Sequence, residues 1–128
     1  MVKVLVVDDH TGIRNALTRL VDNERPHLCS VGAAANGKDA LAMASANQPD
    51  VILLDVVLGD EDGLALIAPL HRSAAVVVLT SLVDRRVAER ALRLGAVACV
   101  HKSAPAAELL ACIAHASANF TLPASAPP

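Results

Sequence analysis

The feature that most constrains the fold of this chain is a series of apolar runs, each about as long as a β-strand. The four clearest runs cover residues 2–7, 51–54, 75–79 and 96–100, and a weaker fifth candidate covers 29–33. Strands that are apolar at nearly every position are typical of a parallel sheet covered by helices on both faces. The runs therefore predict a buried parallel sheet.

The segments between these runs have helical spacing, with apolar residues three or four positions apart. Residues at their boundaries favour helix ends: Asn36, Asp62, Asp84 and Ser103 as N-caps, Pro105 in a first turn and Gly95 at a C-terminus. Strand and helix alternate five times. We therefore expect one doubly wound α/β domain over residues 1–120, in which five parallel strands have helices on both faces. The Pro- and Ala-rich residues 121–128 are expected to form a tail or the start of a linker.

Composition excludes several classes of protein. Hydrophobic residues make up 54% of the 128 residues, which is enough to build a folded core. Phe120 is the only aromatic residue and the net charge is -2, so direct nucleic-acid contact is not expected. No apolar run approaches the roughly 20 residues of a membrane span, and we expect a cytoplasmic protein. Cys29, Cys99 and Cys112 lie too far apart for a zinc or redox motif.

Polar residues follow four of the apolar runs at the point where each run ends. In chain order these are Asp8 and Asp9, Asp55, Thr80 and Ser81, and Lys102. Ligands of open α/β sheets bind beyond the carboxyl ends of the strands, so these side chains are expected to share one site. Taken singly, each has a simpler reading, because an Asp pair often forms a turn, a Thr a helix cap and a Lys a surface charge.

The set of residues suits phosphoryl transfer. Three carboxylates in one pocket repel one another, and burial would raise their pKa values unless a cation were present. Mg2+ prefers carboxylate, water and phosphate oxygens, whereas zinc prefers His and Cys. A metal ion, an ammonium group and a hydroxyl are the groups that position and neutralise a phosphoryl group, with Asp55 as the attacking carboxylate.

Four segments of the sequence resemble the signatures of response-regulator receiver domains. They are VLVVDDH, PDVILLDVVLGDEDG, VVVLTS and GAVACVHKS, which occur in the family's order and spacing. The resemblance covers about residues 2 to 118, and it implies the flavodoxin-like receiver fold. One such signature alone is weak evidence, whereas four on the appropriate strand ends are specific.

The resemblance also implies a role for each site residue. Asp55 would accept a phosphoryl group from a sensor histidine kinase, Lys102 would neutralise the phosphoryl oxygens, and the Thr80 hydroxyl, next to Ser81, would move toward them. The ligands of Mg2+ would be Asp8, Asp9, Asp55 and the backbone carbonyl of Val57. Such a domain assists its own phosphorylation and dephosphorylation and otherwise acts as a signalling protein.

The start of the chain, Asp-Asp-His followed by Arg14, is most similar to receivers that precede a LuxR/NarL-like helix-turn-helix domain. This implies transcription control by an output domain or homodimer that contacts the fourth helix, fifth strand and fifth helix. Arg86, Arg90 and Arg93 share one face of that fourth helix, as solvated arginines also often do.

The sequence departs from the family's pattern in three ways. Gly59 stands where a Pro is usual, and we expect it to loosen the loop after Asp55. Cys99 replaces the Tyr or Phe that usually reports phosphorylation, so the usual aromatic switch is missing. Residues 60–62 form an acidic rim that could influence the choice of kinase.

Other functions remain as alternatives. A haloacid-dehalogenase-like phosphohydrolase needs a second Asp two positions after its nucleophile, where this chain has His10 or Val57. A nucleotide-binding module would need a glycine-rich phosphate loop after the first strand. A stand-alone receiver that acts as a relay or adaptor is one alternative. A receiver-like interaction module that no longer takes phosphate is another; the complete set of Asp8, Asp9, Asp55, Thr80 and Lys102 argues against it, whereas Cys99 favours it.

Overall fold

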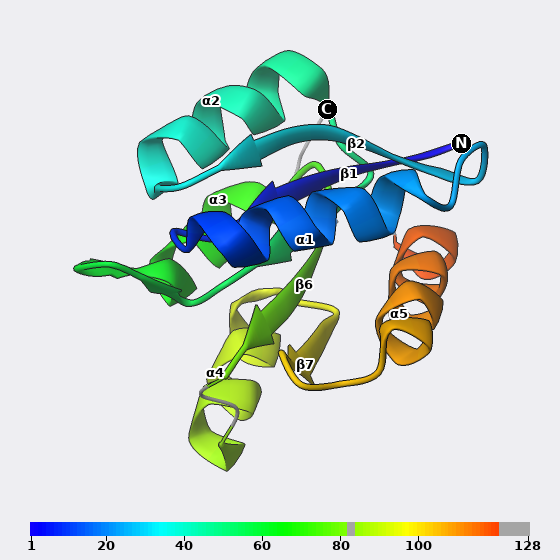
Figure 1. Ribbon diagram of the computed structural model, residues 1–128. Coiled ribbons are helices and arrows are strands. Elements are labelled where there is room, and N and C mark those ends of the chain that lie inside the picture. Colours follow the sequence, from blue (N-terminus) through cyan, green and yellow to red (C-terminus); the bar gives the residue numbers. More distant parts are fainter. Residues whose placement is uncertain (82–83, 121–128) are drawn as a thin grey trace, which may run out of the picture.

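The computed structural model describes residues 1–81 and 84–120, and the expected tail at 121–128 lies outside this part of the chain. A parallel sheet forms its centre, with the strand order β2-β1-β3-β6-β7 (Figure 1). The strands are β1 (Val2–Val7), β2 (Leu28–Ala34), β3 (Val51–Leu54), β6 (Ala75–Thr80) and β7 (Ala98–His101). The predicted five-stranded doubly wound fold is confirmed, and the strand bounds agree with the apolar runs to within two residues.

Helices cover both faces of the sheet (Figure 1). They are α1 (Thr11–Asp22), α2 (Gly37–Asn47), α3 (Ile67–Leu70), α4 (Arg85–Leu94) and α5 (Ala106–Asn119), with a 3-10 turn, η1 (Gly63–Leu66), before α3. On one face, Val21 of α1 and Ile113 of α5 pack with Val4 and Val6. On the other face, residues of α2, α3 and α4 pack around Leu5 and Ile52. None of the helices within the described residues combines the length and apolarity that a membrane crossing needs.

Side-chain caps begin three of the helical segments as expected. Asn36 accepts from the Asp39 amide at the start of α2, Asp62 from the Leu64 amide in η1, and Asp84 from the Val87 amide in α4. Gly95 ends α4 in the left-handed conformation. The expected Ser103 cap of α5 is wrong. The N-cap of that helix is Pro105, which has no side-chain acceptor, and the Ser103 hydroxyl instead pairs with His101 Nδ1 at 2.6 Å.

A short hairpin lies between β3 and η1, and no apolar pattern predicted it. Its two strands, β4 (Val57–Leu58) and β5 (Glu61–Asp62), pair antiparallel around a turn at Gly59, whose φ is +58°. Positive φ is a conformation that glycine adopts at little cost. The hairpin projects beyond the carboxyl ends of the strands, as the green arrow at the left of Figure 1 shows.

The cysteines have the modest role that the sequence suggests. Cys29 is buried, and Cys99 and Cys112 are half-buried; all three are free thiols. Burial raises the pKa of the Cys99 thiol, which therefore stays protonated at neutral pH. Cys99 packs against the core cluster on the α2–α3–α4 face of the sheet, as expected for a small hydrophobic side chain.

Asp22 joins the end of α1 to β2 and makes stability depend on pH. Its carboxylate accepts from the Ser30 amide at 2.8 Å and from the Ser30 hydroxyl at 2.9 Å. The backbone hydrogen bond from Ser30 is the main cause that lowers the pKa of Asp22. Burial opposes it, and the Ser30 hydroxyl and the nearby Arg25 lower the pKa further. Because this pKa is lowered on folding, the ionised carboxylate stabilises the fold above the ordinary aspartate pKa. That contribution is lost as the pH falls through the folded-state pKa.

We therefore expect Asp22→Asn to lower the free energy of unfolding by about 0.5–1 kcal/mol at neutral pH, since the site is partly solvated. Urea unfolding over a pH series measures this difference. The gap between Asp22→Asn and wild type should shrink as the buffer becomes acidic, because the wild-type carboxyl is then also uncharged. A gap that widens on acidification would contradict the assignment.

Candidate functional site

The candidate site residues are fixed by hydrogen bonds that continue the sheet beyond the regular strands. The Asp8 amide donates to the Ala34 carbonyl at 3.0 Å, and the Asp55 amide donates to the Val7 carbonyl at 3.0 Å. The Lys102 amide donates to the Thr80 carbonyl at 3.1 Å. The parallel strands thus bring residues that are far apart in sequence to one edge of the sheet, as the strand-end argument requires.

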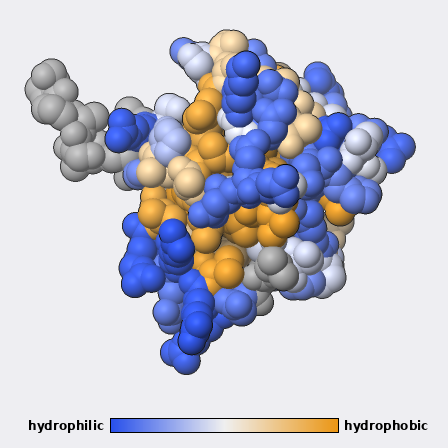
Figure 2. All heavy atoms as spheres, turned by 90° about the vertical axis from the view of Figure 1, so that its left-hand side faces the viewer, coloured by the Kyte–Doolittle hydropathy of each residue, from blue (hydrophilic) through white to orange (hydrophobic). Residues whose placement is uncertain are grey.

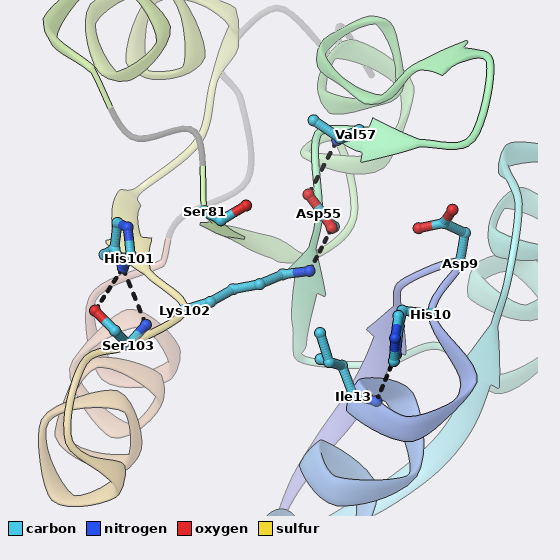
Figure 3. Close-up of a pocket in the computed structure, with 9 residues that line it drawn as sticks. All are labelled: Asp9, His10, Ile13, Asp55, Val57, Ser81, His101, Lys102 and Ser103. Atoms are coloured by element: carbon cyan, nitrogen blue, oxygen red, sulfur yellow. Dashed lines mark hydrogen bonds and ion pairs between the residues drawn. The ribbon is translucent and has the colours of Figure 1, made fainter.

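Lys102 lies between two carboxylates. Its Nζ is 2.6 Å from Asp55 Oδ2 and 2.8 Å from Asp8 Oδ2. The side chains of Asp8 and Asp55 are only 2% and 5% exposed, so this ion-paired cluster is largely removed from solvent. In Figure 3 the Lys102 side chain extends across the cavity toward Asp55. Two buried carboxylates are tolerated here because a cation and backbone amides compensate their charge.

The pKa of Lys102 is raised by this environment. Burial is the largest single effect and on its own would lower the pKa of the ammonium group. The hydrogen bonds and the negative charges of Asp55 and Asp8 together outweigh burial. Lys102 therefore remains charged at neutral pH and is available to neutralise an anionic group in the cavity.

Asp9 completes an acidic cluster. One carboxylate oxygen from each of Asp8, Asp9 and Asp55 lies within 4.8 Å of the other two. Three carboxylates in such a small volume suit a hard divalent cation of the Mg2+ type, which binds oxygen ligands. Asp9 is exposed and points into the cavity in Figure 3, so it offers an open approach to the cluster.

The hairpin orients the central carboxylate from the other side. The Val57 amide donates to Asp55 Oδ1 at 3.0 Å, and the Gly59 amide at the hairpin turn donates to Asp9 Oδ2 at 3.1 Å. Asp55 is therefore held by both oxygens, one on the Val57 amide and the other on Lys102. The expected loosening of this loop by Gly59 finds no support, because the Gly59 amide connects the turn to Asp9.

The two candidate hydroxyl groups occupy different environments at the end of β6. Thr80 is fully buried within the sheet edge. Ser81 is exposed and lines the cavity, and its side chain points toward Asp55 in Figure 3. Of the two, Ser81 is therefore the hydroxyl that faces the cavity directly in this structure.

The cavity above Asp55 has a volume of about 740 Å³. Besides Asp9, Asp55, Val57, Ser81 and Lys102 it is lined by His10, Ile13, His101 and Ser103. Figure 2 faces the carboxyl ends of the strands and shows apolar surface at the centre of this face, flanked by hydrophilic side chains. The pocket can therefore receive a small anionic group at Lys102 and contact a larger partner around its edge.

Sequence reasoning gave no functional role to the four additional lining residues. His10 Nδ1 accepts from the Ile13 amide at 3.3 Å and so caps α1, while its own amide donates to Asp8 Oδ1 at 2.9 Å. His101 accepts from Ser103 on the opposite side of the cavity. The sequence did hold a signal for two of them, because His10 directly follows the Asp pair and His101 directly precedes Lys102. Residues next to site residues in sequence often line the same cavity.

Gly63 explains how the backbone after Asp55 is packed. A Cβ atom at this position would lie 2.6 Å from the Asp55 carbonyl oxygen and 2.5 Å from the Val56 Cα atom. The Gly63 amide also donates to the Val56 carbonyl at 2.8 Å. Only glycine, which has no Cβ atom, lets the backbone at position 63 pack this closely against the backbone of Asp55 and Val56. The chain can therefore return from the hairpin directly beside Asp55.

Comparison with known proteins agrees with this geometry. The family model described as the response regulator receiver domain matches residues 4–114. A putative transcriptional regulator of Pseudomonas aeruginosa is 41% identical over 113 residues, which are 86% of this chain and 54% of that protein. The chain thus spans about half the length of the first curated relatives that it matches.

Two solved structures extend the comparison to three dimensions. The signal receiver domain of the putative response regulator NarL from Mycobacterium tuberculosis has a TM-score of 0.83 and 25% identity, covering 92% of this chain and 97% of that chain. The predicted likeness to NarL-like receivers is confirmed. A Burkholderia pseudomallei response regulator, solved with a phosphorylated aspartic acid, a calcium ion and citrate, has a TM-score of 0.80 and 30% identity, with 92% and 69% coverage. From its fold and its match over most of its length, this chain belongs to the family of response regulator receiver domains of two-component signalling.

Proposed function

We propose that Asp55 accepts a phosphoryl group from the phosphohistidine of a sensor kinase and that this modification changes the partner affinity of the domain. The observation that carries the proposal is the position of Lys102 Nζ, 2.6 Å from Asp55 and 2.8 Å from Asp8, beside three clustered carboxylates. The Burkholderia pseudomallei regulator, which carries a phosphorylated aspartic acid, supports the same chemistry for this fold.

The proposed ligands of Mg2+ are Asp8, Asp9, Asp55 and the backbone carbonyl of Val57. The cluster of oxygen donors within 4.8 Å fits such an ion, and Lys102 alone leaves the three carboxylates with excess negative charge. When bound, Mg2+ supplies positive charge that offsets the carboxylates and the phosphoryl oxygens.

In the proposed transfer, a carboxylate oxygen of Asp55 forms a bond to phosphorus while the bond from phosphorus to the donor imidazole nitrogen breaks. The electron pair of that bond stays on the imidazole nitrogen, which then takes a proton. The Val57 amide holds Asp55 in one orientation, and the Lys102 ammonium group neutralises charge that spreads over the phosphoryl oxygens. The domain thus contributes to its own phosphorylation and dephosphorylation.

The proposed output passes through the end of β6. Thr80 and Ser81 lie at this end, and α4 begins at Arg85. A hydroxyl that turns toward the phosphoryl oxygens would bias an existing equilibrium between two positions of α4. Because Cys99 lacks an aromatic ring, the partner surface of α4, β7 and α5 would change through this movement of α4.

For the whole protein we propose a cytoplasmic regulator of transcription. Residues 1–120 would form the receiver, and residues 121–128 would form a tail or the start of a linker to an output domain. The half-length match to a putative transcriptional regulator supports this arrangement. The sensor kinase would approach the cavity at Asp55, and the output domain or homodimer partner would contact α4, β7 and α5.

A titration followed by NMR tests the proposal. Adding Mg2+ should shift the amide resonances of Asp9, Val57 and Gly59, and adding beryllium fluoride as a phosphoryl mimic should shift those of Ser81 and α4. A metal chelator should reverse both changes. An absence of shifts around the acidic cluster at millimolar Mg2+ would overturn the proposal.

A further inference from the structure

The β4–β5 hairpin is attached to the rest of the domain at two points, and one of them lies outside the cavity. At its turn, the Gly59 amide donates to the Asp9 carboxylate. On its second strand, Glu61 Oε2 accepts from the Gly37 amide at 3.0 Å, across 24 positions of sequence. Gly37 is the first residue of α2, so the hairpin connects the acidic cluster to the start of a helix on the α2–α3–α4 face of the sheet.

From this connection we propose that Glu61 is a positioning residue for the metal site. It anchors the hairpin to α2 and thereby places the Val57 backbone and the Gly59 amide against Asp55 and Asp9. The inference rests on the proposed function, because it concerns how tightly the same acidic cluster binds a divalent cation.

The contact between Glu61 and Gly37 is close and specific. A Cβ atom at position 37 would lie 2.5 Å from Glu61 Oε2 and 3.0 Å from the side chain of Leu66. The first-turn amides of α2 have no partner within the helix, and Asn36 caps the amide of Asp39. Glu61 satisfies the Gly37 amide with a charged acceptor, which the positive end of the helix dipole favours.

The hairpin transmits this anchor to the site through its pairing. Glu61 pairs with Leu58, whose side chain is buried in the core, and Asp62 pairs with Val57. Val57 and Gly59 flank Leu58, and their amides hold Asp55 and Asp9. A hairpin without the Glu61 anchor would lose its hydrogen bond to α2, and the two amides would be less well placed.

The acidic run at residues 60–62 therefore divides into different roles. Asp62 caps η1, and Glu61 binds the Gly37 amide. Asp60 lies at the hairpin turn beside Gly59 and is exposed. Asp60 has the same charge as Glu61 and an adjacent position, so it provides a matched control for a purely electrostatic effect on cation binding.

The test is the Mg2+ dissociation constant of the full chain, measured from NMR shifts of the Asp9 and Gly59 amides. Glu61→Ala should weaken Mg2+ binding about tenfold, the lower end of the effect seen when groups that orient metal ligands are removed. Glu61→Gln keeps an oxygen acceptor and should restore binding to within about twofold of wild type. Asp60→Asn should leave the constant nearly unchanged.

A second variant approaches the same contact from α2. Gly37→Ala should displace the Glu61 side chain and weaken Mg2+ binding in the wild-type background. In the Glu61→Ala background the Gly37→Ala substitution should weaken Mg2+ binding little further, because both substitutions remove the same hydrogen bond between Glu61 and the Gly37 amide. Equal weakening by Asp60→Asn and Glu61→Gln would assign the effect to charge and overturn the inference. Wild-type Mg2+ affinity in Glu61→Ala would also overturn it, whereas a wild type that binds no Mg2+ would instead overturn the proposed function.

Discussion

Replacing Asp55 by Asn is expected to abolish phosphoryl uptake from a small donor such as phosphoramidate in the presence of Mg2+. The amide side chain has the same shape and keeps an oxygen to accept from the Val57 amide, so the fold should persist. It has no anionic oxygen to attack phosphorus, and the covalent step is lost. Intact-protein mass spectrometry measures the added phosphoryl group directly.

Asp60→Asn is the matched control for this experiment, since it removes one carboxylate on the hairpin turn without touching the Lys102 cluster. This variant should take up one phosphoryl group as wild type does. Uptake by Asp55→Asn at the wild-type rate would show that another residue is the acceptor.

Lys102→Met is expected to have the largest effect on stability. Methionine keeps an unbranched apolar stem and removes the ammonium group, which leaves the buried carboxylates of Asp8 and Asp55 without their shared cation. Breaking a buried ion pair by removal of one partner is strongly destabilising. Because the Lys102 side chain is 17% exposed, we expect a somewhat smaller loss of about 2–4 kcal/mol in the free energy of unfolding at neutral pH.

The sign of the pH effect follows from the raised pKa of Lys102. A raised folded-state pKa means that the ammonium group contributes fully below the ordinary lysine pKa and that the contribution is lost as the pH rises through the folded-state pKa. The full decrease in the free energy of unfolding of Lys102→Met is therefore expected at neutral pH. Urea unfolding in a chelating buffer at that pH measures it.

Added Mg2+ should recover more stability in Lys102→Met than in wild type. A ligand that binds only the folded state stabilises it in proportion to the logarithm of its concentration over its dissociation constant. Without Lys102 the carboxylates carry more uncompensated charge and should bind a cation more tightly. Equal stabilisation of the two proteins by Mg2+ would contradict the view that Lys102 and the metal neutralise the same carboxylates.

The sheet and the site positions could be predicted because the signals for both lie in short stretches of sequence. A strand buried on both faces is apolar at almost every position, and residues 2–7 and 51–54 coincide with β1 and β3. Polar residues directly after such runs must lie at the carboxyl edge of the sheet. Asp8, Asp55 and Lys102 therefore meet there although 47 positions separate each neighbouring pair.

The details that could not be predicted depend on contacts between distant segments. The hairpin between Val57 and Asp62 has two strands of two residues each, too short for a periodic pattern. The hydrogen bond from the Gly37 amide to Glu61 is another such contact. From sequence alone, Gly37 indicates the start of a helix and Glu61 a surface charge, and nothing connects the two. Serine is a residue type that favours helix caps, but the Ser103 hydroxyl pairs with the His101 ring instead. Local propensity does not decide between such competing partners.

The central claim is that the acceptor is the carboxylate of Asp55, and the most direct measurement locates the phosphoryl group itself. Wild-type protein treated with Mg2+ and phosphoramidate would be reduced with borohydride, which converts an aspartyl phosphate to homoserine. Peptide mass spectrometry should then find homoserine at position 55. Homoserine at another aspartate, or a phosphoryl group that remains on a histidine or serine after reduction, would contradict the account.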